Sequence, residues 1–152
     1  MIDIVKVFND AATDAGYEFA YGRKDIQNYE MSRAVEMSGG ETVLLLFPFI
    51  EKGVIDNSLV FKWDVSTTLW LGKKFDFDNT SGTYSELDET EKQKYDRRLK
   101  DLRDAMAALI KTIFCNEPDL ELTNVRIFRE INQFDENLDF IVADINFFAD
   151  DS

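Results

Sequence analysis

The chain has 152 residues, and its 30 acidic and 17 basic side chains give a net charge of −13 at pH 7. It contains no histidine and one cysteine, Cys115, which excludes histidine acid–base chemistry, Cys/His zinc sites and an internal disulfide. The excess of acid predicts no sequence-specific nucleic-acid binding, because such binders present a basic patch to the phosphates. With 45% hydrophobic residues and no Pro- or Gly-rich linker, residues 1–152 are expected to form a single domain.

The N-terminal stretch predicts neither a signal nor a transit peptide, since it carries Asp3, Asp10 and Asp14 and lacks a long apolar core. The longest apolar run covers residues 43–50. This is far short of the roughly 20 residues that a membrane-spanning helix needs. We therefore expect no transmembrane segment.

Apolar residues at helical spacing predict a first helix over residues 2–15, including Ile4, Phe8 and Ala12. Gly16 follows at the position of a left-handed C-cap. Residues 17–23 are expected to add a short strand. The polar residues 24–40 are expected to form a loop.

Two apolar segments then indicate an antiparallel hairpin. Residues 42–50 are typical of a central strand. Pro48 is expected to place the last residues of this strand at an edge or in a bulge. Residues 58–71 alternate apolar and polar side chains. The turn residues Gly53, Asp56 and Asn57 lie between the two segments and predict the connection.

A long helix is predicted over residues 86–115. Ser85 precedes it, and Asn116 and Pro118 end it. Its apolar stripe comprises Leu87, Tyr95, Leu99, Leu102, Met106, Leu109, Ile110 and Ile113. Cys115 closes this stripe and is expected to be a buried, inert thiol.

A second hairpin follows the long helix. Val125 and Ile127 face one way in its first strand, and the odd-numbered residues 139–147 share one side of its second strand. Residues 135–137 form the predicted turn. The fold class is therefore α+β, with a four- or five-stranded, mainly antiparallel sheet and both helices, short and long, packed on one face. The other face would carry Lys62, Asp64, Ser66 and some exposed aromatic residues.

Several aromatic residues fall at strand ends or off the regular alternation. Core packing accounts for such residues, but a partner surface is the alternative, because large exposed apolar patches mark association sites. The residues in question are Trp70, Phe75, Phe77, Phe128, Phe134, Phe147 and Phe148.

No catalytic, cofactor-binding or metal-binding residue is predicted. The segment from Asp76 to Asp78 begins like a calcium loop, but the glycine and the bidentate glutamate of such a loop are each one residue out of register. Asp139 and Asp144 are an odd number of residues apart, so they point to opposite faces of a strand. No phosphate-binding glycine motif is present. We therefore expect a protein that is not an enzyme.

The first hairpin ends in a long alternating strand that includes residues 59–65 (LVFKWDV), and the closing hairpin ends in residues 144–148 (DINFF). Together with the short first helix and the dominant second helix, this order resembles the small tail-terminator and head-to-tail joining (minor tail) proteins of tailed bacteriophages and prophages. The resemblance covers most of the chain. It implies an α+β subunit that assembles into a ring with itself and contacts other tail proteins, in the virion or the host cytoplasm, without catalysing a reaction.

Two other hypotheses remain open. The first is a monomeric acidic adaptor or inhibitor that binds a basic protein partner through charge. The second is a carboxylate-dependent hydrolase, which would require acidic residues to converge in a cleft. Self-association distinguishes the ring-forming subunit from the adaptor.

Overall fold

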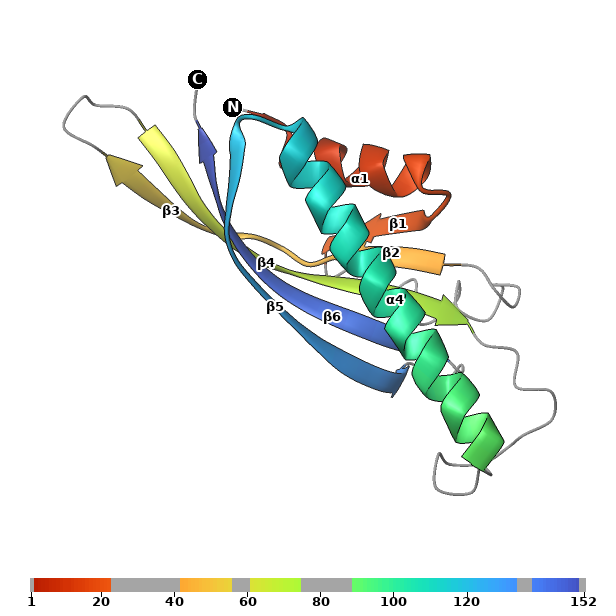
Figure 1. The fold of residues 1–152 in the computed structure, drawn as a ribbon. Helices are drawn as coiled ribbons and strands as arrows, with labels where there is room; N and C mark the ends of the chain where they lie inside the picture. Colours follow the sequence, from red (N-terminus) through yellow and green to blue (C-terminus); the bar gives the residue numbers. More distant parts are fainter. Residues whose placement is uncertain (1, 23–41, 56–60, 75–88, 134–137, 151–152) are drawn as a thin grey trace.

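A computed structural model describes residues 2–22, 42–55, 61–74, 89–133 and 138–150, and these contain two helices and six strands (Figure 1). In chain order the elements are α1 (Ile4–Asp14), β1 (Glu18–Tyr21), β2 (Thr42–Leu46), β3 (Ile50–Ile55), β4 (Phe61–Lys74), α4 (Glu89–Asn116), β5 (Leu120–Gln133) and β6 (Leu138–Asp150). The α+β class is therefore confirmed. The predicted helix start at Ser85 and the predicted loops and turns at 24–40 and 135–137 lie outside the described residues.

The strands form one mixed sheet in the order β1-β2-β4-β6-β5, and β3 pairs with β4. β1 runs parallel to β2, and every other pair is antiparallel. The expectation of four or five strands was thus wrong for the described residues, which form six. β4 is the central element, because β6 occupies one of its edges while β2 and β3 share the other.

The apolar run at residues 42–50 divides into two strands, where one was expected. β2 ends opposite Leu69 and β3 begins opposite Ser66, so both pair with β4 in succession. Between them, the Phe47 amide donates to the Thr68 carbonyl at 3.0 Å, and the Thr67 hydroxyl donates to the Phe47 carbonyl at 2.7 Å. Pro48, which has no amide hydrogen, follows directly and interrupts the ladder.

Gly53 also differs from its predicted place in a turn. It lies within β3 opposite Trp63 of β4, whose ring is 3.4 Å from the position of a Cβ at Gly53. The hairpin therefore consists of β3 and β4, and it extends two residues beyond Gly53.

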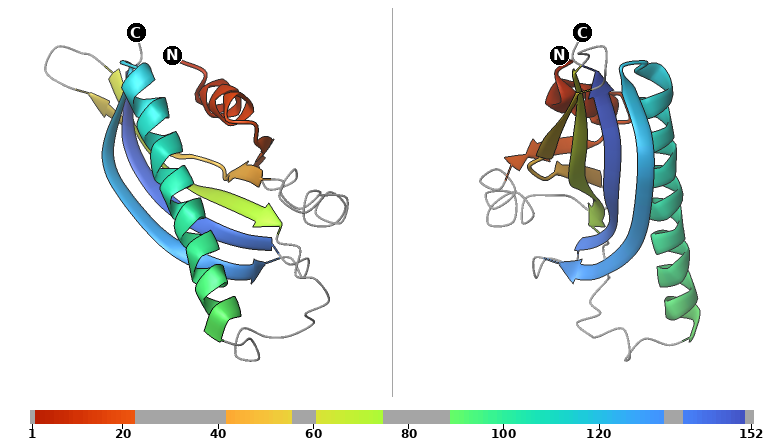
Figure 2. Two further views of the ribbon diagram at one scale, coloured as in Figure 1. Left: turned by 45° about the vertical axis from the view of Figure 1, so that its right-hand side comes forward. Right: turned by 90° about the vertical axis from the view of Figure 1, so that its left-hand side faces the viewer.

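The two helices pack on one face of the sheet, each over a different part of it (Figure 2). α1 contacts β1 and β2, whereas α4 contacts β4, β5 and β6. Asp3 caps α1 by accepting the Lys6 amide, and Gly16 follows the helix with φ 79°. The core between helices and sheet includes Phe8, Leu99, Leu102, Met106, Leu109, Ile110, Ile113, Val65, Leu69, Leu71, Ile141, Ala143, Ile145 and Phe147.

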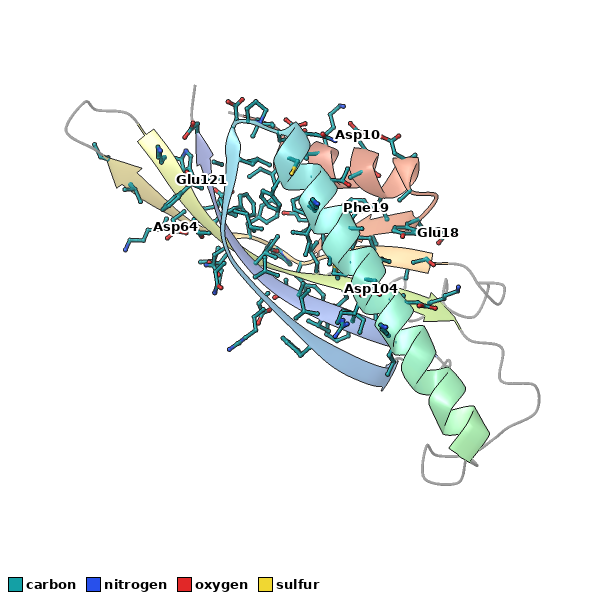
Figure 3. The ribbon with its side chains drawn as sticks, viewed as in Figure 1. Asp10, Glu18, Phe19, Asp64, Asp104 and Glu121 are labelled. Carbon is teal, nitrogen blue, oxygen red and sulfur yellow. The ribbon has the colours of Figure 1, made fainter. Side chains whose placement is uncertain are left out.

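The other face of the sheet has a polar part and an apolar part. Lys62, Asp64 and Ser66 lie on it, as predicted, and Asp64 is on the far side of the sheet from α4 (Figure 3). At the opposite end of β4 this face carries a small second core of Ala20, Val43, Leu45 and Phe140, with Phe47 and Trp70 packed against it.

Two of the aromatic residues singled out in the sequence are core residues, and one is exposed. Phe147 belongs to the main core and Trp70 packs in the second core, whereas Phe128 remains 39% exposed. Phe75, Phe77 and Phe134 lie outside the described residues.

Cys115 is exposed, so the prediction of a buried thiol was wrong. It is two residues beyond the buried Ile113 of α4, which turns its side chain by about 200° around the helix and away from the core. Neither described helix has the length and apolar character needed to cross a membrane.

Candidate functional site

The β3 strand presents an apolar edge to solvent. Ile50, Val54 and Ile55 are 75%, 39% and 58% exposed, and three of the four large hydrophobic residues that are exposed in the described part of the chain lie on this strand. Ile50 and Val54 share one face of the strand, and Ile55 lies on the other face. We call these three side chains the β3 edge. Within the described ranges β3 pairs with β4 alone. Figure 1 shows both strands of this hairpin extending past the region that the helices cover.

An apolar groove lies at the opposite edge of the sheet, between the C-terminal half of α4 and β5. Its volume is about 710 Å³. The walls include Ile110 and Phe114 from α4 and Leu122, Val125 and Ile127 from β5. Lys111 and Glu121 are the charged residues among the described side chains that line it, and the Cys115 thiol lies at its wall. We call this cavity the α4–β5 groove.

A second groove separates α1 from α4 and has a volume of about 640 Å³. Small side chains line it, namely Ala11 of α1, the C-cap residue Ala15, and Ala105 and Ala108 of α4. Its charged lining is acidic, with Asp3, Asp10, Asp14 and Glu117 against Lys6. We call it the α1–α4 groove.

Lys6, which lines the α1–α4 groove, forms an ion pair with Asp10 of the same helix. Its Nζ lies 2.6 Å from the Asp10 Oδ2 one helical turn away. The hydrogen bond to Asp10, assisted by the negative charge of that carboxylate, raises the pKa of Lys6 above its ordinary value. Lys6 therefore stays protonated at neutral pH, and this groove keeps a net charge of −3 from four carboxylates and one ammonium group.

A pocket of about 430 Å³ with a mixed polar and apolar lining, which includes Ile50 of the β3 edge, lies on the sheet face away from the helices. Asp144 accepts the Thr68 hydroxyl at 2.8 Å through one carboxylate oxygen and Arg126 at 3.3 Å through the other. Beside it, the Asn146 amide donates to the Ser66 hydroxyl at 2.5 Å. These bonds join β4, β6 and β5 across the ladder, so the geometry assigns the pocket residues to cross-strand pairing.

The described residues contain no cluster of three or more cysteine, aspartate and glutamate side chains that could hold a metal ion. Asp76 and Asp78 lie outside the described residues, so their structure does not bear on the calcium-loop comparison. Asp144 is engaged with Thr68 and Arg126, and the side chain of Asp139 is not among those described. The absence of catalytic, cofactor-binding and metal-binding residues stays a prediction.

The β3 edge and the α4–β5 groove were both missed by sequence reasoning. Gly53 placed residues 53–57 in a turn, and the order Ile-Glu-Lys-Gly-Val-Ile over residues 50–55 has no apolar–polar alternation that would have indicated a strand. The groove combines residues from a helix and a strand whose exposed sides face each other, and a linear pattern carries no signal for such a combination.

Comparison of the chain with protein-family models gives no match, and the search of curated proteins finds none either.

Proposed function

We propose that the protein is a non-enzymatic assembly subunit that acts by self-association into a ring, like the tail-terminator and head–tail connector subunits that its element order resembles. The observation that carries the proposal is the concentration of exposed apolar side chains on β3, at one edge of the sheet, with an apolar groove at the other edge. Exposed apolar surface on an edge strand is a known route to association with another chain.

The arrangement suits a ring because the two apolar surfaces differ from each other and lie at opposite edges. A contact between unlike surfaces is head-to-tail, and repeated head-to-tail contacts give a closed ring when the rotation between subunits closes. A symmetric dimer would use the same surface on both subunits. Contacts with other tail proteins would then fall on surfaces that the ring leaves free.

Charge sets the conditions under which assembly is expected. Each subunit carries a net charge of −13, so subunits repel one another at low ionic strength. Salt screens this repulsion, with a Debye length of about 10 Å at 0.1 M and about 3 Å at 1 M. Apolar contacts are not weakened by this screening, so we expect salt to promote assembly.

The experiment is the molar mass of the full chain by light scattering after size exclusion, over a wide concentration range at low and high salt. A discrete species of several subunits that grows with protein concentration and salt is expected, and electron microscopy of that species should show rings. A strict monomer under all conditions would contradict the proposal.

The second candidate is the acidic adaptor, which the α1–α4 groove favours. The alanines and the net charge of −3 in the lining of the α1–α4 groove fit a cationic amphipathic segment of a partner protein. In that case the chain would remain monomeric and would bind a basic partner with an affinity that falls as salt rises. The opposite salt dependences of the two functions separate them in one titration.

A further inference from the structure

We infer that the β3 edge of one subunit inserts into the α4–β5 groove of the next subunit. The inference rests on the proposed self-association and names the two surfaces that would carry it. Ile50 and Val54, which share one face of β3, would supply the inserted side chains, and Ile55 would flank the contact on the other face. Ile110 and Phe114 on α4 with Val125 and Ile127 on β5 would receive them.

The sheet register shows why the contact must join two molecules. Gly53 of β3 pairs with Trp63, Trp63 pairs with Ala149 of β6, and Ala149 pairs with Leu120 of β5. The β3 edge and the β5 wall of the groove are therefore at the two ends of one row across the sheet, three strand spacings or about 14 Å apart. Because the paired strands β4 and β6 lie between them, the β3 edge cannot reach the groove of its own chain.

The charges near the two surfaces explain why a second copy is a suitable occupant. Lys111 and Glu121 among the groove residues sum to zero, and so do Glu51 and Lys52 on β3. In a chain of net charge −13, these are places where two copies can meet without adding like charge to the contact.

The α1–α4 groove is a poorer receptor for β3. Its charged lining has a net charge of −3, whereas β3 has no net positive charge to match it. Of the two helix-bordered grooves, the α4–β5 groove is also bordered by fewer charged side chains. A strand edge with exposed apolar side chains and no net charge therefore fits the α4–β5 groove better.

Two adjacent alanines on α4 provide a matched test. Ala107 lines the α4–β5 groove and Ala108 lines the α1–α4 groove, and both are exposed. Ala107→Trp is expected to fill the α4–β5 groove and to raise the protein concentration needed for half-assembly by about tenfold or more. Ala108→Trp adds the same side chain to the same helix and is expected to leave that concentration unchanged. Circular dichroism of both variants checks that the fold is retained.

Cys115 allows the contact to be trapped, because it is the only cysteine of the chain and lies at the groove wall. One protein would carry Ile50→Cys together with Cys115→Ser and a size tag, and the second would be the untagged natural chain. Each molecule then has one thiol. Added copper–phenanthroline oxidises two thiols to one disulfide, and the size of each linked pair shows which thiols met. Val54→Cys and Ile55→Cys, each with Cys115→Ser, extend the series along the β3 edge.

The head-to-tail contact predicts that mixed pairs of tagged and untagged chains exceed both like pairs. The control places the new thiol at the exposed Asp104 of α4, as Asp104→Cys with Cys115→Ser, and should give mixed pairs only at the random level. Mixed pairs at the control level for all three β3 positions, in samples that scattering shows to be assembled, would overturn the inference.

The two proposals fail in different ways. If the natural chain is monomeric under all conditions, self-association is wrong and the inference falls with it. If the natural chain assembles but Ala107→Trp assembles equally well, or Ala108→Trp is the variant that blocks assembly, then the inference alone is wrong. A selective effect of Ala107→Trp together with mixed crosslinks would support both.

Discussion

Replacing Gly72 by alanine tests how tightly the second core is packed. Gly72 lies on β4 directly opposite Phe140 of β6, and the Phe140 ring covers the space that a side chain would occupy. A Cβ at position 72 would lie 2.2, 2.5 and 2.7 Å from three carbons of that ring. Carbon atoms in favourable contact are about 3.5–4.0 Å apart, so the ring would have to move by more than about 1 Å.

Phe140 has little room for such a movement. Its side chain is fully buried with Val43 and Leu45, and its ring centroid lies 5.3 Å from that of Trp70. Overpacking of this kind lowers the free energy of unfolding by about 1–3 kcal/mol. Alanine also reduces the conformational freedom of the unfolded chain, which offsets about 0.4–1 kcal/mol of this loss. We expect Gly72→Ala to lower the free energy of unfolding by about 1–2 kcal/mol.

The assay is urea unfolding followed by circular dichroism, at a concentration where the natural chain and the variants have the same oligomeric state. Gly53→Ala is the matched control, since its Cβ would meet the Trp63 ring at an ordinary contact distance of 3.4 Å. It should leave stability within about 0.5 kcal/mol of the natural value. Equal effects of Gly72→Ala and Gly53→Ala would refute the reasoning, because they would show that the Phe140 ring moves aside at no cost.

Three further substitutions test other parts of the fold by the same unfolding measurement. Asp3→Ala removes the side chain that caps α1 and should cost about 1 kcal/mol; an unchanged midpoint would show that the cap adds nothing. Trp63→Ala should cost about 3 kcal/mol, the lower end of the range for tryptophan, because Trp63 is only partly buried against the core; a near-neutral shift would contradict that packing. Asp144→Ala leaves Thr68 and Arg126 without their acceptor and should cost about 1 kcal/mol, and stability equal to that of the natural chain would make these bonds dispensable.

Periodicity was enough to predict the buried sides of the main elements. Met106 and Ile110 of α4 are buried where the helical spacing placed them, and Ile141 and Ile145 of β6 face the core as the alternation required. These patterns are local, because one residue's neighbours in the same element determine which side it presents. Gly16 likewise follows α1 with the positive φ that its place after an apolar stripe predicted.

Features that depend on distant residues were not predictable. β1 pairs in parallel with β2, and nothing within either segment specifies that partner. The division of residues 42–50 depends on the bond from Thr67 to the Phe47 carbonyl, which joins residues 20 positions apart. Cys115 was misplaced for a simpler reason, because proximity in sequence to Ile113 does not place a residue on the same side of a helix.

The central place of β4 has a consequence for how the chain folds. Hairpins β3–β4 and β5–β6 close between neighbouring segments, but the ladder between β4 and β6 brings together residues as far apart as Lys62 and Asp150, 88 positions along the chain. Contacts across such separations carry a large loop-closure entropy and slow folding. We therefore expect docking of the two hairpins along β4 and β6 to be the slow step, so that weakening this ladder retards folding, whereas changes at the solvent-facing end of β3 mainly accelerate unfolding.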